Sequence, residues 1–179
     1  MPDDLNLLKG RDKLNCGSGQ RPFDPAQGWI NLDTNPKWNP DVVGDWNNLS
    51  MFADSSMNLV LSWHSLEHVG CGEADGFIRE AHRILKPDGK LIVVVPDPKA
   101  IAQRFLLGQI DEYIYNVNTY GAFMDSEADR HRWSFSRQGL SDYLKRLCPW
   151  HDVHAFNFRQ LPGTDICGDW WYHGQEATK

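Results

Sequence analysis

The sequence predicts an α/β domain built on a mainly parallel sheet, and three observations lead to that prediction. Residues 91–95 form a continuous apolar run, which is typical of a strand buried on both faces of a parallel sheet. A helical pattern over residues 73–85 and another β-like run over residues 58–63 precede it, and this spacing favours a parallel crossover. Near the N-terminus, a short strand runs into a glycine turn at residues 14–19.

The remaining elements of the first half follow from short apolar runs and turn residues. The predicted strands span residues 12–16, 29–32, 41–43, 58–63 and 90–95. The helix over residues 73–85 carries apolar side chains at helical spacing and ends before Pro87 and Gly89, which stop a helix and turn the chain.

The second half predicts a helix–strand–strand ending. Ser136 is the expected N-cap of a helix over residues 136–147, whose apolar stripe starts at Leu140. Two extended stretches, residues 152–158 and 169–172, are joined by a loop at residues 160–168 and predict an antiparallel pair. Before them, residues 99–107 predict a helix that leads into irregular structure, of the kind that often walls a substrate site.

Length and composition favour one domain. The 179 residues suit a single unit spanning residues 1–179, with flexible ends expected at residues 1–11 and 174–179. The net charge of −6 argues against a broad phosphate-binding surface, and the basic residues at 130–132 are expected to be a solvated patch. None of the four cysteines has Cys-x-x-Cys spacing, so neither a zinc ribbon nor a redox pair is indicated. Without a leader-like N-terminus or a long apolar run, we expect a cytoplasmic protein that does not enter membranes.

The glycine turn and a following acid predict a nucleoside site. Gly17 and Gly19 let the backbone turn sharply and approach a ligand. Asp33 stands at the end of the next predicted strand, where a carboxylate can accept hydrogen bonds from two ribose hydroxyls. A ligand site is therefore expected at the carboxyl ends of the strands.

Six segments in this order carry a resemblance to a known family. They are residues 14–19, Asp33, residues 43–46 with Asp45, residues 53–62, residues 64–68 (His-Ser-Leu-Glu-His) and residues 79–91. Over residues 12–158 the chain resembles the class I S-adenosylmethionine-dependent methyltransferases, in particular the small type 11 group. The resemblance implies a Rossmann-like sheet of seven strands, mostly parallel with an antiparallel last strand, and a pocket where the first and fourth strands diverge.

The resemblance also implies a cofactor and its contacts. S-adenosylmethionine would bind, and S-adenosylhomocysteine would leave as its product. The cofactor-binding residues expected from the motifs are Cys16, Gly17, Gly19, Asp33, Asp45, Trp46, Ser62 and His64. Asp33 would hold the ribose, Asp45 the adenine amino group, and Ser62 would line the floor near the methyl group. Trp46 is equally consistent with a core position.

Two histidines are the catalytic candidates. His64 is a candidate general base, although an ordinary structural histidine fits the same position. His131, with Trp133 beside it, could contact the methyl acceptor. Both residues belong to the irregular segment before the helix over residues 136–147, which is expected to form a late wall of the substrate site. Glu67 and His68 are read as hydrogen-bonded support for the site, and no metal ligand set is assigned.

The chain departs from the family pattern after its first two strands. The links over residues 20–28 and 34–40 are too short for full helices and contain prolines, so trimmed helices are expected there. The apolar surface left behind would be hidden by Trp29, Trp38 and Trp46, or by a partner subunit in a homodimer through the edge at strands two and three.

Three other functions compete with methyl transfer to a small-molecule or a sugar- or lipid-linked acceptor. A non-catalytic module could keep the fold and the cofactor. Residues 64–68 match the H-x-x-E-H pattern of a zinc peptidase, which needs both histidines on one helical face and a third ligand downstream. Dinucleotide binding would need a glycine at position 22, where the chain has Pro22. The net acidity, and the absence of an Asn-Pro-Pro-Tyr type motif after the fourth strand, argue against a nucleic-acid acceptor.

Overall fold

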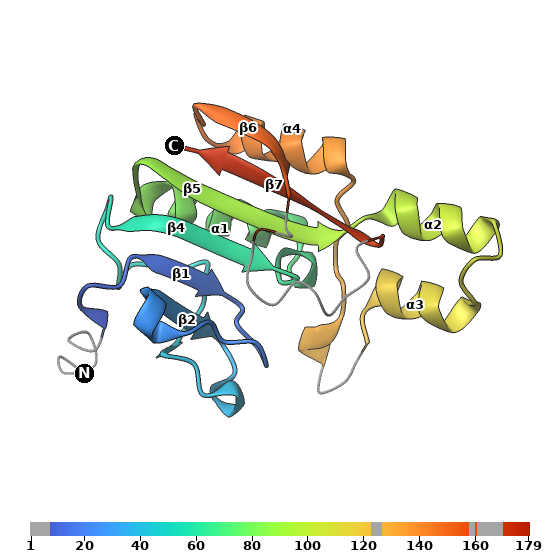
Figure 1. Ribbon diagram of the computed structural model, residues 1–179, viewed down its shortest axis with the longest axis horizontal. Helices are drawn as coiled ribbons and strands as arrows, with labels where there is room; N and C mark the ends of the chain where they lie inside the picture. Colours follow the sequence, from blue (N-terminus) through green and yellow to red (C-terminus); the bar gives the residue numbers. More distant parts are fainter. Residues whose placement is uncertain (1–7, 123–126, 158–159, 161–169) are drawn as a thin grey trace.

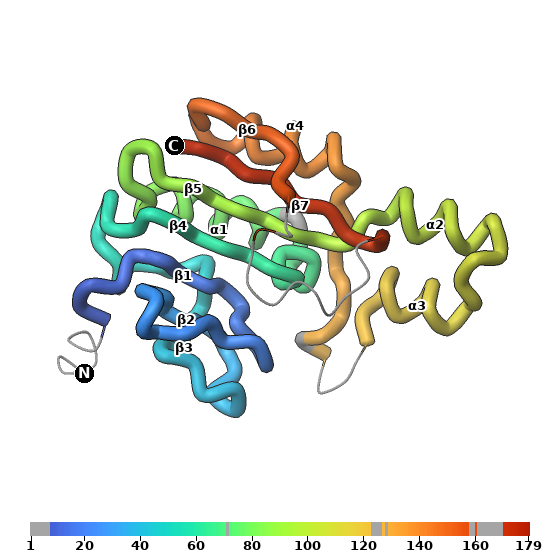
Figure 2. Tube along the Cα trace, viewed as in Figure 1, coloured from blue at the N-terminus to red at the C-terminus, as the bar shows by residue number. Residues whose placement is uncertain are grey.

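The computed structural model describes residues 8–122, 127–157, 160 and 170–179, and its centre is one seven-stranded sheet (Figure 1). The strands are β1 (Lys13–Cys16), β2 (Trp29–Asp33), β3 (Val42–Val43), β4 (Met57–Trp63), β5 (Leu85–Pro96), β6 (Asp152–Phe156) and β7 (Tyr172–Thr178). They are arranged in the order β3-β2-β1-β4-β5-β7-β6, with β3 at one edge and β6 at the other (Figure 2). Only β7 is antiparallel to its neighbours. The predicted fold class is confirmed.

The register of the three central strands brings their carboxyl ends to one level. Cys16 in β1 lies opposite Leu32 in β2 and Ser62 in β4. The segments that follow these strands therefore emerge side by side at one edge of the sheet, where parallel sheets bind ligands.

One face of the sheet is covered by helices. The helices α1 (Cys71–Ile84) and α4 (Arg137–Leu147) lie behind the sheet in Figure 1, and Ser136 caps α4 as predicted by accepting from the Gly139 amide at 3.2 Å. Between them and the strands lies the main core, which includes Leu14, Ile30, Val60, Phe77, Ile78 and Leu144. Two further helices, α2 (Pro98–Leu106) and α3 (Glu112–Tyr120), extend from the carboxyl end of β5.

Aromatic side chains cover the opposite face. Phe23 stacks on Trp29 with ring centroids 4.5 Å apart, and Trp63 lies 6.3 Å from Phe23. The Phe23 backbone is fixed in this position by Asn31, which accepts from its amide at 2.8 Å and donates to its carbonyl oxygen at 2.9 Å. Beneath these rings lie Leu61, Ile92, Val94 and Tyr172.

The trimmed links are confirmed, but the expected tryptophan cover is only partly right. Single 3-10 turns, Pro25–Gln27 and Pro36–Trp38, replace the helices after β1 and β2. Of the three tryptophans, only Trp29 covers the open face. Trp46 packs in the core on the other side of the sheet, and Trp38 is half-buried beside the ligand cleft described below.

Several expectations about the elements are wrong. The segment after residue 107 was expected to be irregular, yet it forms α3, a largely exposed helix without an apolar stripe. The last strand begins at Tyr172 rather than residue 169, and residues 174–179 form most of β7 instead of a flexible end, because that strand pairs with β5 and β6 on its two sides. Residues 161–168 of the loop predicted at residues 160–168, and the first seven residues, lie outside the described residues. Within the described chain, none of the helices has the length and apolar character needed to span a membrane.

Candidate functional site

A cleft of about 580 Å³ opens at the carboxyl ends of β1, β2 and β4. Most residues predicted to bind the cofactor lie around it. Its lining includes Gly17, Gly19, Asp33, Asn35, Trp38, Asp45, Trp46, His64, Ser65 and His68. This position matches the predicted pocket where the first and fourth strands diverge.

The glycine turn is packed from one side and open on the other. Gly17 and Gly19 have φ angles of 71° and 48°, in the region that favours glycine. A Cβ on residue 17 would lie 2.5 Å from the Ser65 Oγ, whereas a Cβ on residue 19 would meet nothing within 4 Å. The Ser65 hydroxyl donates to the Cys16 carbonyl oxygen at 3.0 Å and holds the turn in place. The backbone at Gly19 is therefore accessible to a ligand in the cleft.

The Asp33 carboxylate is oriented by the backbone around it. It accepts from the Gly19 amide at 2.8 Å and, through its other oxygen, from the Asn35 amide at 2.8 Å. The residue is only 8% exposed. Each oxygen keeps a second lone pair, so the carboxylate can still accept from a pair of neighbouring hydroxyls.

Asp45 and Trp46 lie at the far end of the cleft. Asp45 is exposed and accepts from the Asn47 amide at 2.8 Å. Trp46 packs on Phe77 of α1 with ring centroids 4.8 Å apart and lines the cleft, although the residue is only 8% exposed. The core reading of Trp46 is thus right, and the residue also lines the cleft.

Cys16 and Ser62 do not contribute side chains to the cleft, which corrects the expectation for both. Each is fully buried within the sheet, and neither lines the cavity. Burial raises the pKa of the Cys16 thiol far above its ordinary value, so it stays protonated. Alternation along a strand explains the error, because a motif identifies the end of a strand more readily than the face to which each side chain points.

His64 is held by its neighbours at the end of β4. Its backbone has a φ of 52°, and its Nδ1 lies 3.2 Å from the Glu67 Oε1. The ring stacks on Trp171 at 4.8 Å and meets the edge of Tyr172 at 5.0 Å. His64 lines the cleft, but it lies on a strand end, so it does not share a helical face with His68 as a zinc peptidase requires.

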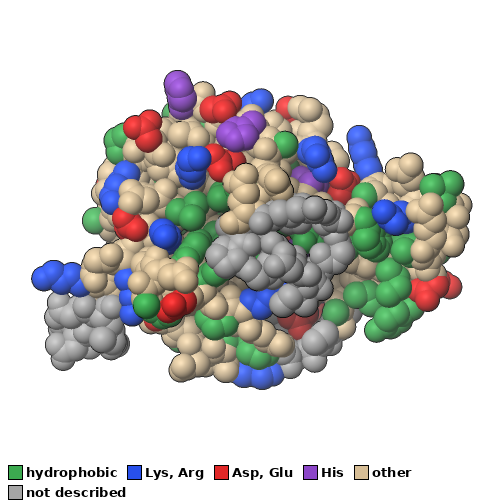
Figure 3. All heavy atoms as spheres, in the orientation of Figure 1, with side chains coloured by type: hydrophobic (Ala, Val, Ile, Leu, Met, Phe, Trp, Pro, Cys, Tyr) green, Lys and Arg blue, Asp and Glu red, His purple; other side chains and the backbone are tan. Residues whose placement is uncertain are grey.

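A second cavity of about 370 Å³ lies beside the cleft, under α2 and α3. His131 and Trp133, the residues predicted for the late wall, both line it. Its other lining residues include Glu67, Val95, Tyr115, Tyr120, Arg132 and Phe135. Outside it, exposed hydrophobic side chains of α2 and α3, such as Leu106 and Tyr113, gather at one end of the molecule (Figure 3).

Glu67 lines the second cavity, and its sequence neighbour His68 lines the cleft. The Glu67 carbonyl oxygen accepts from the Arg132 amide at 2.7 Å and the Trp133 amide at 3.1 Å. These two bonds hold the segment around residues 131–133 against the turn after β4. Burial raises the pKa of the Glu67 carboxyl, but the hydrogen bond from His64 and the nearby His68 and His131 outweigh burial, so the pKa lies below its ordinary value. Burial lowers the pKa of His131 despite the attraction of Glu67. A carboxylate is therefore buried among the imidazoles of His64, His68 and His131.

The sequence motifs did not indicate several lining residues. Ser65 was quoted only as part of the 64–68 pattern, and Asn35 and Trp38 belong to a link that has no family motif. The asparagine before Pro36 is a turn signal that could have placed that link near Asp33.

Comparisons with known proteins agree with this geometry. A family model for the methyltransferase domain matches residues 22–93. A SAM-dependent methyltransferase from Archaeoglobus fulgidus is 14% identical with a TM-score of 0.63, and the match covers 99% of this chain and 90% of that one. A SAM-dependent methyltransferase from Thermotoga maritima, described as a possible histamine N-methyltransferase, is 20% identical with a TM-score of 0.61, covering 98% and 89%.

A third solved structure contains ligands. The 1,6-didemethyltoxoflavin-N1-methyltransferase of Burkholderia thailandensis, with bound 1,6-didemethyltoxoflavin and S-adenosylhomocysteine, is 15% identical with a TM-score of 0.55. The match covers 99% of this chain and 76% of that one. No curated protein matches the chain significantly. At these identities the structures show a shared fold, and the family model adds a match in sequence across β2 to β5. The described chain therefore shares the fold of S-adenosylmethionine-dependent methyltransferases, and its residues 22–93 match the methyltransferase domain in sequence.

Proposed function

We propose that this protein transfers a methyl group from S-adenosylmethionine to a small molecule, free or linked to a sugar or lipid, that binds in the second cavity. The observation that carries the proposal is the pair of adjoining cavities, which share Arg132 in their lining. One is built from the glycine turn and Asp33, and the other is lined mainly by apolar and aromatic side chains. A cofactor and an acceptor that occupy them would meet at the wall between them.

The residues of the cleft fit the cofactor. The open space above Gly19 allows a ligand to lie close to the backbone. The Asp33 carboxylate, which accepts from the Gly19 amide at 2.8 Å, keeps free lone pairs for the ribose hydroxyls of that ligand. We assign Asp33 to the ribose hydroxyls, Asp45 to the adenine amino group and Gly17 with Gly19 to the methionine and ribose portion. When bound, S-adenosylmethionine supplies a methyl group that its cationic sulfur already activates.

The protein's main task is therefore orientation, which can contribute about 7–11 kcal/mol to lowering a barrier. We assign His64 a positioning role, because Glu67 and Trp171 fix its ring. Trp133 and His131 would contact the acceptor. The aromatic lining contributed by Tyr115, Tyr120 and Phe135 favours an acceptor with a flat apolar part.

The comparisons support a small acceptor. The Burkholderia thailandensis neighbour is named for the acceptor 1,6-didemethyltoxoflavin, and the Thermotoga maritima neighbour is described as a possible histamine N-methyltransferase. A nucleic-acid acceptor is disfavoured by the net charge of −6. A homodimer through the edge at β2 and β3 stays a prediction.

Calorimetry with S-adenosylhomocysteine tests the cofactor assignment. We expect Asp33→Ala to weaken binding by about 1–3 kcal/mol, since it removes acceptors from buried partners. Asp88→Asn, in the first part of β5 and outside the lining of the cleft, is the acidic control and should bind as the wild type does. Equal affinity of Asp33→Ala and the wild type would remove Asp33 from this role.

An activity assay separates the proposal from a non-catalytic module. Production of S-adenosylhomocysteine is followed with a panel of aromatic hydroxy and amino compounds. Turnover with any member supports methyl transfer. Binding of the cofactor product without turnover on any acceptor, including sugar- and lipid-linked ones, would favour the non-catalytic module.

A further inference from the structure

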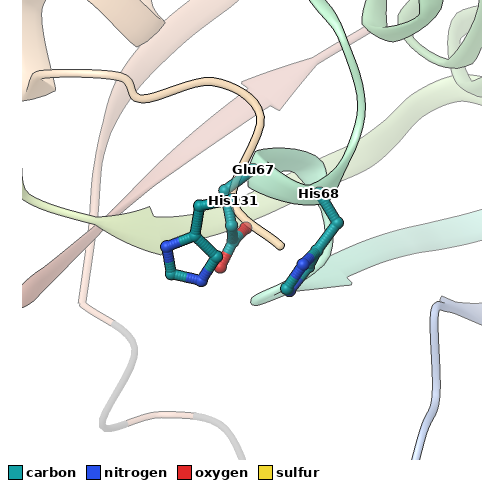
Figure 4. Close-up of side chains that lie close together, drawn as sticks. All are labelled: Glu67, His68 and His131. Carbon is teal, nitrogen blue, oxygen red and sulfur yellow. The ribbon is translucent and has the colours of Figure 1, made fainter. Parts of the chain in front are cut away.

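We propose that Glu67, His68 and His131 bind one divalent transition-metal ion in the wall between the two cavities. One potential ligand atom from each of the three side chains lies within 4.8 Å of the others. Figure 4 shows the Glu67 carboxylate between the two imidazole rings. Glu67 and His68 come from the 3-10 turn Leu66–His68 after β4, and His131 comes from the segment after α3.

The donor set suits a specific class of ion. Two imidazoles and a carboxylate are typical ligands of zinc, iron, cobalt or nickel, and three protein ligands leave positions open on the ion. Bonds of about 2.0–2.2 Å place the ligand atoms of a tetrahedral ion about 3.5 Å apart. The three side chains would therefore draw together by roughly 1 Å through side-chain rotation when an ion binds.

An unsatisfied oxygen points to a missing cation. The Glu67 Oε1 is paired with His64 at 3.2 Å, but the Oε2 has no hydrogen-bond partner among the described residues. Glu67 is only 2% exposed. A buried carboxylate oxygen without a partner is costly and rare, and a bound cation would satisfy it.

Both histidines are held in the manner of metal ligands. The His68 Nδ1 lies 3.3 Å from the Arg130 carbonyl oxygen, and His131 makes a hydrogen bond to the backbone of Asn118. A backbone carbonyl that binds one ring nitrogen leaves the other free for an ion and fixes the ring. The His131 amide also donates to the Tyr120 carbonyl oxygen at 3.0 Å, so its backbone is anchored.

Neighbouring cations are paired outside the group. Arg130 lies 3.6 Å from Glu127, and Arg132 lies 3.7 Å from Glu73. The Glu67 carboxylate pairs with an imidazole, that of His64, at 3.2 Å.

The location of the group indicates what the ion would do. This role rests on the proposed function, whereas metal binding itself does not. Glu67 and His131 line the acceptor cavity, whereas His68 lines the cofactor cleft. An ion held by all three would offer its open positions to an acceptor oxygen and lower the pKa of a bound hydroxyl. The acceptor class would then be a molecule with a hydroxyl, carbonyl or carboxylate oxygen next to a flat apolar part.

Metal binding is tested on the full chain without a polyhistidine tag. After treatment with a chelator, the protein is dialysed against Zn²⁺ or Co²⁺, and bound metal is measured by mass spectrometry and calorimetry. We expect one ion per chain, a visible absorption band for Co²⁺, and a loss of affinity of at least about tenfold in His68→Gln and in His131→Gln. His154→Gln is the matched control, because His154 also lies beside carboxylates, Asp152 at 2.8 Å and Glu176 at 3.8 Å.

Three results would overturn the inference. They are a wild-type chain that binds no ion, unchanged affinity in both His68→Gln and His131→Gln, and an equal loss of affinity in His154→Gln. Far-UV circular dichroism and thermal unfolding of each variant identify loss of folding, and Glu67→Gln provides a nearly isosteric third variant. A wild-type chain that binds S-adenosylhomocysteine but no metal overturns this inference alone, whereas one that binds metal but not S-adenosylhomocysteine overturns only the proposed function.

Discussion

The Ser65 side chain lies directly against Gly17. Its hydroxyl donates to the Cys16 carbonyl oxygen at 3.0 Å, and a Cβ on residue 17 would come within 2.5 Å of it. This contact joins the end of β1 to the turn after β4. The glycine at 17 is therefore required both by its φ of 71° and by the serine packed beneath it.

Gly17→Ala and Gly19→Ala should separate these two requirements. Both place a Cβ at positive φ, which costs about 1–2 kcal/mol. Gly17→Ala should cost about 1–3 kcal/mol more, because the methyl group overlaps Ser65, whereas the position at Gly19 is open. Urea unfolding of the two variants measures the difference. Adding Ser65→Gly should recover part of the loss in Gly17→Ala, and equal free energies of unfolding for the two alanine variants would contradict this packing.

Phe23 should protect the sheet face opposite α1 and α4. Phe23→Ala uncovers Trp29, so we expect the free energy of unfolding to fall by about 1–3 kcal/mol and an apolar dye to bind more strongly. Phe23→Leu keeps an apolar cover and should show a smaller change. Analytical ultracentrifugation of the wild type tests the predicted dimer. A monomer whose Phe23→Ala variant self-associates would show that the protein's own aromatic side chains keep this face covered.

His173 should make stability depend on pH. The residue is 1% exposed in β7, and its Nε2 lies 2.9 Å from the Phe135 carbonyl oxygen. Burial lowers its pKa, although the bond to Phe135 and the charge of Asp97 partly oppose this effect. The unfolded chain therefore takes up the proton first as the pH falls. Stability is full above the unfolded pKa and decreases as the pH falls toward the folded pKa.

The measurement is urea unfolding at pH values from 8 down to 5. The decrease in stability should be smaller in His173→Gln, whose amide can still donate to Phe135. The exposed His151 provides the control, and His151→Gln should behave as the wild type. An unchanged pH dependence in His173→Gln would show that this imidazole does not carry the effect.

Residues with a strong local signal were predictable from the sequence. The apolar run of β5 and the cap at Ser136 specify their elements locally, and the structure agrees with both. The turn expected at Pro87 and Gly89 is wrong, because α1 ends at Ile84 and both residues lie within β5. The helix α3 was missed because it is rich in tyrosine and asparagine and lies mostly exposed, so neither propensity nor periodicity marks it. β7 was misplaced because its order comes from pairing with β5 and β6, which the local sequence does not encode.

The candidate site divides in the same way. Asp33, Gly17 and Gly19 lie together around the cleft because motifs mark strand ends, and strand ends meet at one edge of the sheet. Their contact with a cofactor stays a prediction. Cys16 and Ser62 were misassigned because the motif does not specify which way their side chains point. The proximity of His131 to Glu67 depends on a chain reversal after α3, which no local pattern predicts.

The most direct measurement is a crystal structure of the wild-type chain with S-adenosylhomocysteine. The account predicts the nucleoside in the 580 Å³ cleft, with both ribose hydroxyls on Asp33 and the backbone of Gly19 against the ligand. A ligand bound elsewhere, or Asp33 without contact to the ribose, would contradict it.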